Sequence, residues 1–310
     1  MKIVYMGTPD FAVPPLESLV KNGYGVVGVF TQPDKPVGRK AVLTPSAVKV
    51  TAQKHGIPVF QPETLKNGEG TKILEKLKPD IVVVIAYGKI LPVDFLEFPH
   101  YGCINIHGSV LPKYRGAAPI QRCVLNGEEY AGVTSMQMDA GLDTGDILLV
   151  EKTKIGENET SGELFDRLSV IGADLLIKTL KTVEAGKLSP QKQDDSQSTY
   201  ASMLDKKMSP VDWSKSASEI HNQIRGLDPW PVAQTVFDGK NLKLFRSEIA
   251  ETDGDGEPGE IRLLKNGVIV FCGDRNAVFI NEVQYEGKKR MKSADFFRGR
   301  HISDKTVLGR

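Results

Sequence analysis

The first half of the chain alternates short apolar runs with amphipathic stretches. Runs of apolar and β-branched residues occur at 2–6, 26–31, 57–60 and 80–86. Stretches with helical spacing of apolar residues follow or separate them, at 11–22, 46–55 and 69–77. This alternation is typical of successive strand–helix–strand units, and it predicts an α/β domain with a parallel sheet. Residues 80–86 are apolar on both alternating faces, so we expect them to form the middle strand of that sheet.

A long amphipathic helix is predicted to close this domain. Ser161 and Glu163 precede apolar residues at helical spacing, and the pattern ends at Gly186. The periodicity is then lost in a segment rich in Gln, Asp and Ser, which is typical of a linker that crosses a surface. We therefore predict a first domain at 1–189, a linker at 190–207 and a second domain at 208–310.

The second domain has a different pattern. One helix-like stretch at 216–225 precedes short alternating runs separated by Gly, Asn and Asp turns, at 232–237, 241–248, 259–264, 267–272 and 276–284. Such a series of short strands predicts a small, mostly antiparallel barrel. We expect Trp213 and Trp230 to pack in this domain and its junction rather than to stack on bases, because exposed tryptophan is uncommon.

Composition narrows the functional classes. The 310 residues exceed what one hydrophobic core usually serves, in agreement with two domains. The formal net charge of +1 excludes a uniformly basic surface, so a polyanion has to bind a local patch. The three cysteines lack C-x-x-C spacing and indicate neither a disulfide framework nor a cysteine zinc site. The chain opens with a strand-like run and has no stretch of about 18 uninterrupted apolar residues, so we expect a cytoplasmic protein with no signal peptide and no membrane partner.

The first glycine turn is not a dinucleotide fingerprint. Gly7, Thr8 and Pro9 lie between the first strand and the first helix, where such a fingerprint would stand, but the G-x-G-x-x-G residues are missing. Two interpretations stay open. The turn either caps the helix through Thr8 or Asp10, or its backbone cradles an anionic part of a substrate at the helix N-terminus.

The densest chemical signal is the segment at 103–119. Asn105 and His107 alternate along a strand, so they project from the same face, close to the point where Gly108 ends the strand. A second strand at 133–138 leads into a loop at 139–146 that contains two glycines and three aspartates. Substrates of open parallel sheets bind at the carboxyl ends of the strands. We therefore expect an Asn, a His and an Asp to converge there.

Such a trio suits acyl transfer to an amine. The amide of Asn can donate to the oxyanion of a tetrahedral intermediate, and His can handle the proton of the attacking amine while Asp orients it. The trio needs no metal and no covalent nucleophile, and Ser109 lacks the G-x-S-x-G context of a hydrolase serine. Plainer interpretations stay open: His107 as a buried structural residue, the aspartates as turn formers, or a carboxylate metal loop, although its spacing departs from the EF-hand.

The run from Asn105 to Pro119, followed by Asp139 to Asp146, resembles the signature of the 10-formyltetrahydrofolate-dependent formyltransferases. The similarity extends over essentially the whole chain, from Gly7-Thr8-Pro9 to 224–231, and is greatest to the members that act on methionyl-initiator tRNA. It implies a Rossmann-like formyltransferase domain with a parallel sheet and a smaller OB-like β-barrel domain at the C-terminal end. It also implies that the catalytic residues are Asn105, His107 and Asp143. Gly108 and Val110 stand where the family commonly has Ala and Leu.

The resemblance further implies that 10-formyltetrahydrofolate is the formyl donor. Its pterin is expected against the backbone of the segment at 86–92, and two further segments are expected to enclose the folate. The residues expected to contact it are Ala86, Tyr87, Gly88, Lys89, Ile90, Leu91, Ser109, Val110, Leu111, Pro112 and Asp139.

A tRNA substrate requires Lys and Arg side chains that neutralise phosphates, and two local patches provide them. One is the loop at 32–49, and the other is the basic tail that begins at Gly287, which could also be only a solvated charged face. The residues expected to contact tRNA are Gly7, Thr8, Pro9, Arg39, Lys40, Lys288, Lys289 and Arg290.

The resemblance therefore implies an enzyme that transfers the formyl group of 10-formyltetrahydrofolate to the α-amine of methionyl-initiator tRNA, and we expect it to be a monomer. Three alternatives stay open. The same trio could formylate an amino-sugar nucleotide, or it could release formate from the folate by hydrolysis. The chain could also be a folate- or RNA-binding module without catalytic activity. An incomplete trio would have indicated this third alternative.

Overall fold

The computed structural model describes residues 1–38, 41–252, 256–300, 302 and 306–309, and the chain folds as two compact units. Unit 1 consists of Met1–Gly116, Gly132–Thr153 and Phe165–Tyr200. Unit 2 consists of Ala117–Ala131, Lys154–Leu164 and Ala201–Arg310. Two segments of the predicted first domain thus group with unit 2, and the division at 189 and 207 stays a prediction.

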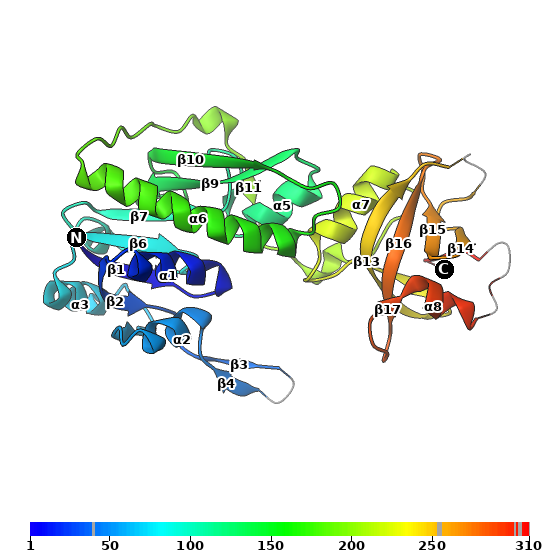
Figure 1. Cartoon of the computed structure of the whole chain (residues 1–310), viewed down its shortest axis with the longest axis horizontal. Helices are drawn as coiled ribbons and strands as arrows, with labels where there is room; N and C mark the ends of the chain where they lie inside the picture. The colour runs from blue at the N-terminus through cyan, green and yellow to red at the C-terminus, as the bar shows by residue number, and fades with distance from the viewer. Residues whose placement is uncertain (39–40, 253–255, 301, 303–305, 310) are drawn as a thin grey trace. The chain divides into compact units, whose positions relative to one another are not determined.

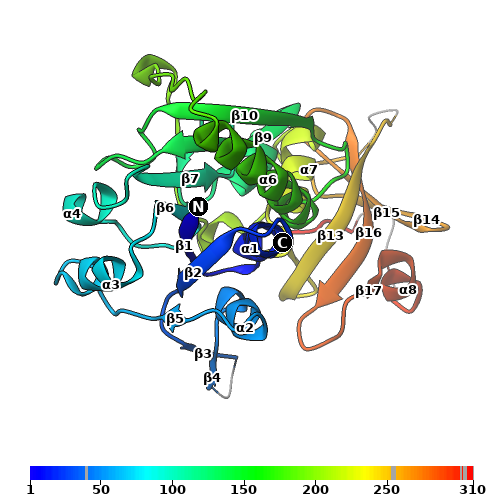
Figure 2. The ribbon, with the colours of Figure 1, turned by 60° about the vertical axis from the view of Figure 1, so that its left-hand side comes forward.

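Unit 1 is built on a seven-stranded sheet in the order β10-β9-β7-β6-β1-β2-β5 (Figure 1; β5 is labelled in Figure 2). Its strands are β1 (Lys2–Gly7), β2 (Gly25–Phe30), β5 (Val59–Phe60), β6 (Ile81–Ile85), β7 (Cys103–His107), β9 (Tyr130–Gln137) and β10 (Ile147–Lys154). β6 is the fourth of the seven strands, and all five of its residues are buried. The prediction that residues 80–86 form the middle strand is therefore confirmed.

The sheet is mixed rather than fully parallel. The pairs β1–β2, β1–β6, β2–β5 and β6–β7 are parallel, whereas β9 runs antiparallel to β7. The predicted parallel sheet is thus correct for five strands and wrong for β9. Six consecutive residues of β9 are buried, and a strand buried on both faces shows the same continuous apolar pattern in either direction. The sequence pattern therefore carried no information on its direction.

Helices cover both faces of this sheet. The helices of this part of the chain are η1 (Asp10–Ala12), α1 (Val13–Lys21), α2 (Ala47–Lys54), α3 (Glu69–Leu77), α4 (Val93–Leu96), α6 (Ser161–Glu184) and η2 (Asp195–Gln197). α6 packs closely on Ile106, because a Cβ at Gly172 would lie only 3.2 Å from Ile106 Cγ2. On the other face, the Cys103 thiol donates to the carbonyl of Phe95 in α4. Since side chains alternate along β7, Asn105 and His107 face away from α6.

Two small ladders complete the description of this part. β3 (Lys35–Val37) and β4 (Val42–Thr44) form an antiparallel hairpin that projects from unit 1 (Figure 2), and it was not predicted. β8 (Arg115–Gly116) pairs with β11 (Tyr200–Ala201).

Unit 2 contains an antiparallel sheet in the order β12-β13-β16-β15-β14, with β17 against β16. Its elements are α5 (Pro119–Leu125), η3 (Lys206–Met208), α7 (Ala217–Gly226), β12 (Gln234–Phe237), β13 (Lys240–Ala250), β14 (Ile261–Leu264), β15 (Gly267–Phe271), β16 (Ala277–Tyr285), β17 (Met291–Lys292) and α8 (Ser293–Arg298). The segment at 306–309 joins the two edge strands: Ile261 N donates to Thr306 O on the β14 side, and Gly309 N donates to Val236 O on the β12 side. The predicted antiparallel β domain is confirmed.

The two tryptophans of unit 2 differ in burial. Trp213 is 5% exposed, and its Nε1 donates to Thr235 Oγ1 at 3.0 Å. Trp230 is 51% exposed. Trp213 thus packs inside unit 2 as expected, whereas the expected packing of the half-exposed Trp230 at the junction stays a prediction. Among the residues that the structure describes, no helix has the length and apolar character needed to cross a membrane.

Candidate active site

Three parallel strands end side by side at one edge of the unit 1 sheet. Gly7, the last residue of β1, pairs with Ile85 at the end of β6. Val84 of β6 pairs with Asn105 of β7. The turn at 7–9, the segment at 86–91 and the end of β7 therefore lie along the same edge. This is where open parallel sheets commonly bind their substrates.

His107 is buried at this edge and held in one orientation. Its side chain is 7% exposed, and its Nε2 lies 2.9 Å from the carbonyl oxygen of Tyr114. Because a carbonyl oxygen can only accept, Nε2 carries a proton and donates it. Nδ1, the other ring nitrogen, lies 3.7 Å from Asp143 Oδ2. The structure thus brings His107 and Asp143 together.

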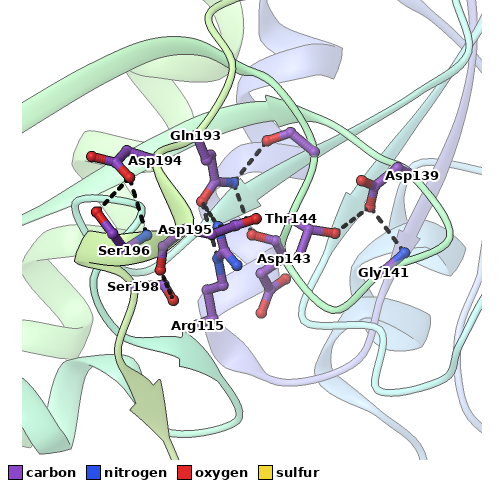
Figure 3. Close-up of polar contacts among 11 residues, drawn as sticks. Arg115, Asp139, Gly141, Asp143, Thr144, Gln193, Asp194, Asp195, Ser196 and Ser198 are labelled. Carbon is purple, nitrogen blue, oxygen red and sulfur yellow. Dashed lines mark hydrogen bonds and ion pairs between the residues drawn. The ribbon is translucent and has the colours of Figure 1, made fainter.

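Asp143 lies in a loop that folds back toward β7. Its carboxylate is 13% exposed, and Oδ2 accepts a hydrogen bond from Gly116 N at 2.8 Å. The backbone of Asp143 has a φ of +54°, in the left-handed region that non-glycine residues seldom adopt. Another carboxylate of the same loop only stabilises the turn: Asp139 Oδ1 accepts from Gly141 N at 3.0 Å and from Thr144 Oγ1 at 2.7 Å (Figure 3).

Asn105 supplies a polar group on the same face as His107. It is 9% exposed and lies opposite Met136 in the ladder between β7 and β9. Among the described residues, no side chain or backbone group is hydrogen-bonded to its amide. A nearly buried amide without a protein partner is suited to bind a polar group of a substrate.

The segment that follows β7 is fixed by a threonine that the sequence analysis missed. Thr134, fully buried and opposite His107 in β9, donates to Ser109 O at 2.7 Å and accepts from Leu111 N at 3.1 Å. The Ser109 hydroxyl donates to Lys113 O at 2.6 Å, so it stabilises the turn. Thr134 could not be recognised from sequence, because its contacts depend on the pairing of β9 with β7.

The segment at 86–91 presents its backbone at the same edge. Ala86 and Gly88 have φ values of +48° and +80°. The carbonyl of Tyr87 accepts hydrogen bonds from Thr8 Oγ1 at 3.2 Å and from Gln32 Nε2 at 2.9 Å. The Tyr87 ring belongs to the hydrophobic core of unit 1, where burial raises the pKa of its hydroxyl to about 12. Tyr87 therefore contributes to this edge through its backbone.

Two further side chains of this segment behave differently. Lys89 Nζ donates to Pro62 O and to Glu63 O, each at 2.7 Å, and this anchors the segment to the loop after β5. Burial lowers the pKa of Lys89. Ile90 is 75% exposed, an unusual position for a large apolar side chain. Leu91 is buried in the core. Of these residues, only Ile90 offers its side chain to a ligand.

A hollow of about 650 Å³ lies beside α4, at the end of β7 that is opposite to His107. Its walls include Gly102, which precedes β7, and Met138, which follows β9. Of the residues expected to contact folate, only Asp139 lines it. The hollow is therefore next to the loop at 139–146, and Asn105, His107 and Asp143 do not line it.

The residues expected to contact tRNA have several environments. Gly7 is packed so closely that a Cβ would lie 2.7 Å from that of Ala12, and Pro9 O accepts from Ala12 N. Lys288 and Lys289 are exposed in unit 2. The two basic residues Arg39 and Lys40 lie outside the described residues.

Arg290 is engaged within unit 2. Its Nε pairs with Glu282 Oε2, and its guanidinium lies 4.0 Å from the centre of the Phe245 ring. The other predicted contacts of unit 2, Lys288 and Lys289, form no side-chain hydrogen bond or ion pair with the described residues. Arg290 thus has a structural role in addition to any contact with a ligand.

The cysteines do not provide a nucleophile. Cys103, Cys123 and Cys272 are all buried, and none forms a disulfide. Burial raises the pKa of both Cys103 and Cys272 to about 12, so both remain thiols at neutral pH. Within the described part of the chain, no three His, Cys, Asp or Glu side chains are grouped as a metal site would require.

Comparison with known families and proteins gives consistent matches. The formyl transferase family profile matches residues 1–180, and the profile of the formyl transferase C-terminal domain matches residues 203–301. A methionyl-tRNA formyltransferase of Clostridium novyi (strain NT) is 49% identical over 310 residues, which cover 99% of this chain and 100% of that protein. The enzyme of the same name from Bacillus subtilis (strain 168) is 48% identical over 309 residues, which cover 99% and 98%.

Solved structures show the same fold. An N-formyltransferase from Helicobacter canadensis, in complex with folinic acid and dTDP-3-aminofucose, superposes with a TM-score of 0.70 at 24% identity and covers 92% of this chain and 99% of that one. WlaRD, a sugar 3N-formyltransferase, gives a TM-score of 0.69 at 22% identity and covers 93% of this chain and 99% of that one.

Proposed function

Because the chain belongs to the formyl transferase family, we propose that it transfers the formyl group of 10-formyltetrahydrofolate to the α-amine of methionyl-initiator tRNA. The observation that carries the proposal is identity of 48–49% to methionyl-tRNA formyltransferases over nearly the entire length of both chains. The convergence of a histidine and an aspartate beside an unpartnered asparagine amide supports the same chemistry. The sugar formyltransferases share the fold at lower identity, and fold alone does not assign an acceptor.

In the proposed reaction the neutral amine attacks the formyl carbon, and a tetrahedral oxyanion forms. The Asn105 amide donates a hydrogen bond to this oxyanion. His107 can donate from Nδ1 only as the imidazolium, because Nε2 already donates to Tyr114 O. Asp143 holds the imidazolium and relays the amine proton. The new bond joins the amine nitrogen to the formyl carbon, the bond to N10 of the folate breaks, and N10 takes up a proton.

The residues at the sheet edge fit a folate donor. The backbone at 86–91 offers amide and carbonyl groups to the polar edge of a pterin, and the exposed side chain of Ile90 can pack on its ring face. Ser109 to Pro112 and the loop at Asp139 are proposed to enclose the folate from the other side, and Thr134 stabilises the first of these segments. The donor supplies the activated formyl group.

The tRNA is proposed to contact both units. In unit 1 the backbone at 7–9 lies at the same edge as the trio, and Arg39 and Lys40 are proposed to contact the acceptor stem. In unit 2 the exposed Lys288 and Lys289 are proposed to bind phosphates. The protein is proposed to act as a cytoplasmic monomer, and its cysteines, which form no disulfide, agree with a reducing compartment.

The test is single-turnover transfer of labelled formyl from 10-formyltetrahydrofolate to methionyl-initiator tRNA. The wild-type protein should label the tRNA, and His107→Ala should lose about 10²- to 10⁴-fold in rate, as expected for a proton-transfer group. His55→Ala is the matched control, because His55 pairs with Glu17 at a distance of 2.7 Å and has no role in the proposed mechanism. Label that appears only on an amino-sugar nucleotide, or as free formate without an acceptor, would reject tRNA as the substrate.

A further inference from the structure

Gln193 lies in the segment that follows α6, far in sequence from the proposed catalytic residues. Its side-chain amide nevertheless reaches the loop that carries Asp143 (Figure 3). Gln193 Nε2 donates to the carbonyl oxygen of Asp143 at 2.8 Å and to that of Gly145 at 2.7 Å. Both hydrogens of one amide group thus bind the two carbonyls that flank Thr144.

Arg115 fixes the orientation of this amide. Its Nε and Nη2 donate to Gln193 Oε1 at 3.1 Å and 2.8 Å. Because a guanidinium can only donate, the Gln193 oxygen has to face Arg115 and the NH2 group has to face the loop. Nη2 also donates to Asp195 Oδ1 at 2.7 Å, so the guanidinium itself is anchored to the same segment (Figure 3). The Arg115 side chain is 11% exposed, so its bonds to Gln193 are partly shielded from solvent, whereas the Asp195 side chain is exposed.

The loop needs such support. Asp143 has a φ of +54°, and a non-glycine residue in this region persists only where its surroundings stabilise it. Gly116 N, next to Arg115, holds the Asp143 carboxylate at 2.8 Å. The backbone of Gly116 therefore holds the Asp143 side chain, and the side chain of Gln193 holds the Asp143 backbone. Together these contacts place Oδ2 at 3.7 Å from His107 Nδ1.

We propose that Gln193, oriented by Arg115, is a positioning residue for the formyl transfer: it holds Asp143 in the conformation that reaches His107. The proposal rests on the proposed function of the site, since it assigns a role within that reaction. Gln193 does not contact the reacting atoms, so its loss should lower kcat and leave the KM for methionyl-tRNA nearly unchanged. A misplacement of Asp143 by about 1 Å corresponds to a loss of about 10- to 100-fold in rate.

The experiment is a double-mutant cycle on formyl transfer with Gln193→Ala and Asp143→Asn. Gln193→Ala should lower kcat about 10- to 100-fold in the wild-type background and less than about threefold in the Asp143→Asn background, because Gln193 acts through Asp143. Gln193→Glu keeps the size and the pairing with Arg115 but has no N–H donor, so it should lose activity like Gln193→Ala. Gln197→Ala is the matched control, because Gln197 Nε2 donates to Asp194 Oδ2 within its own segment, at 2.7 Å, and to no other described residue.

Several results would overturn the proposal. A wild-type kcat in Gln193→Ala would do so, and so would equal losses in both backgrounds, which would make Gln193 independent of Asp143. A lowered Tm in Gln193→Ala accompanied by full activity of the fraction that remains folded would assign Gln193 a structural role only. Failure of the proposed function is separate, because it would appear as absence of transfer to tRNA by the wild-type protein. The same double-mutant cycle would then be measured with the acceptor that the wild-type protein does formylate, or by the rate of formate release.

Discussion

Replacement of Gly145 by alanine tests whether the position of Asp143 controls the rate. A Cβ at Gly145 would lie 1.7 Å from Gln137 O and 2.9 Å from Gln137 C, both of which belong to the backbone of β9. Side-chain Cβ atoms essentially never lie within 3.0 Å of another heavy atom, so the loop has to move by at least 1.3 Å. No side-chain rotation can relieve this contact. Asp143 is two residues away and moves with the loop.

A displacement of about this size corresponds to a loss of about 10²-fold in kcat, or about 2.7 kcal/mol of transition-state stabilisation. The assay is steady-state formyl transfer to methionyl-tRNA, with Tm measured on the same preparation. Gly25→Ala is the control, because the nearest atom to a Cβ there is Met1 O at 3.5 Å, an ordinary contact. Wild-type kcat in a stable Gly145→Ala protein would refute the reasoning, since the reaction would then tolerate a shift of the loop that displaces Asp143.

Three further predictions concern other parts of the molecule. Trp213→Ala should lower the free energy of unfolding by about 3–5 kcal/mol and Trp230→Ala by less than about 1 kcal/mol, because the two tryptophans are 5% and 51% exposed. Urea titrations that give equal losses for the two variants would contradict this prediction. Burial lowers the pKa of His221, so the folded state favours its neutral form and the free energy of unfolding should fall as the pH drops below about 6.5. His221→Gln should weaken this pH dependence in urea titrations between pH 7.5 and 5. An unchanged dependence of the free energy of unfolding on pH would argue against the prediction. Cys103 and Cys272 should resist iodoacetamide at pH 8 in the folded protein and react after denaturation, and mass spectrometry that finds rapid labelling of the folded protein would show that these thiols are accessible.

The elements that burial alone specifies could be predicted from the sequence. β6 is apolar at every position, and this pattern placed it correctly in the middle of the sheet. The long helix α6 was predicted because its apolar residues repeat at helical spacing and a Ser–Glu pair precedes them. In both cases the signal is contained within the element itself, since the periodicity reflects which faces are covered.

The features that depend on contacts with distant segments of the chain could not be predicted. The antiparallel direction of β9 follows from its pairing with β7, which leaves no mark on the apolar pattern of either strand. The exposure of Trp230 depends on what its neighbours cover, and composition carries no information on that. Gln193 looked like an ordinary polar residue of a linker, and only the structure brings it to the carbonyls of the Asp143 loop.

Residue types and strand positions pointed to Asn105 and His107, whereas Asp143 was singled out among three loop aspartates by the family resemblance. The geometry of the proposed trio depends on segments that are distant in sequence. Gly116 and Gln193 hold Asp143 from two directions, and each contributes only one or two hydrogen bonds. A hydrogen bond adds about 1 kcal/mol to the stability of a folded protein, whereas a shift of the catalytic group by about 1 Å costs about 10²-fold in rate. Substitutions around this loop should therefore reduce kcat well before they reduce Tm. Thermal stability alone would consequently miss the residues that matter most for the reaction.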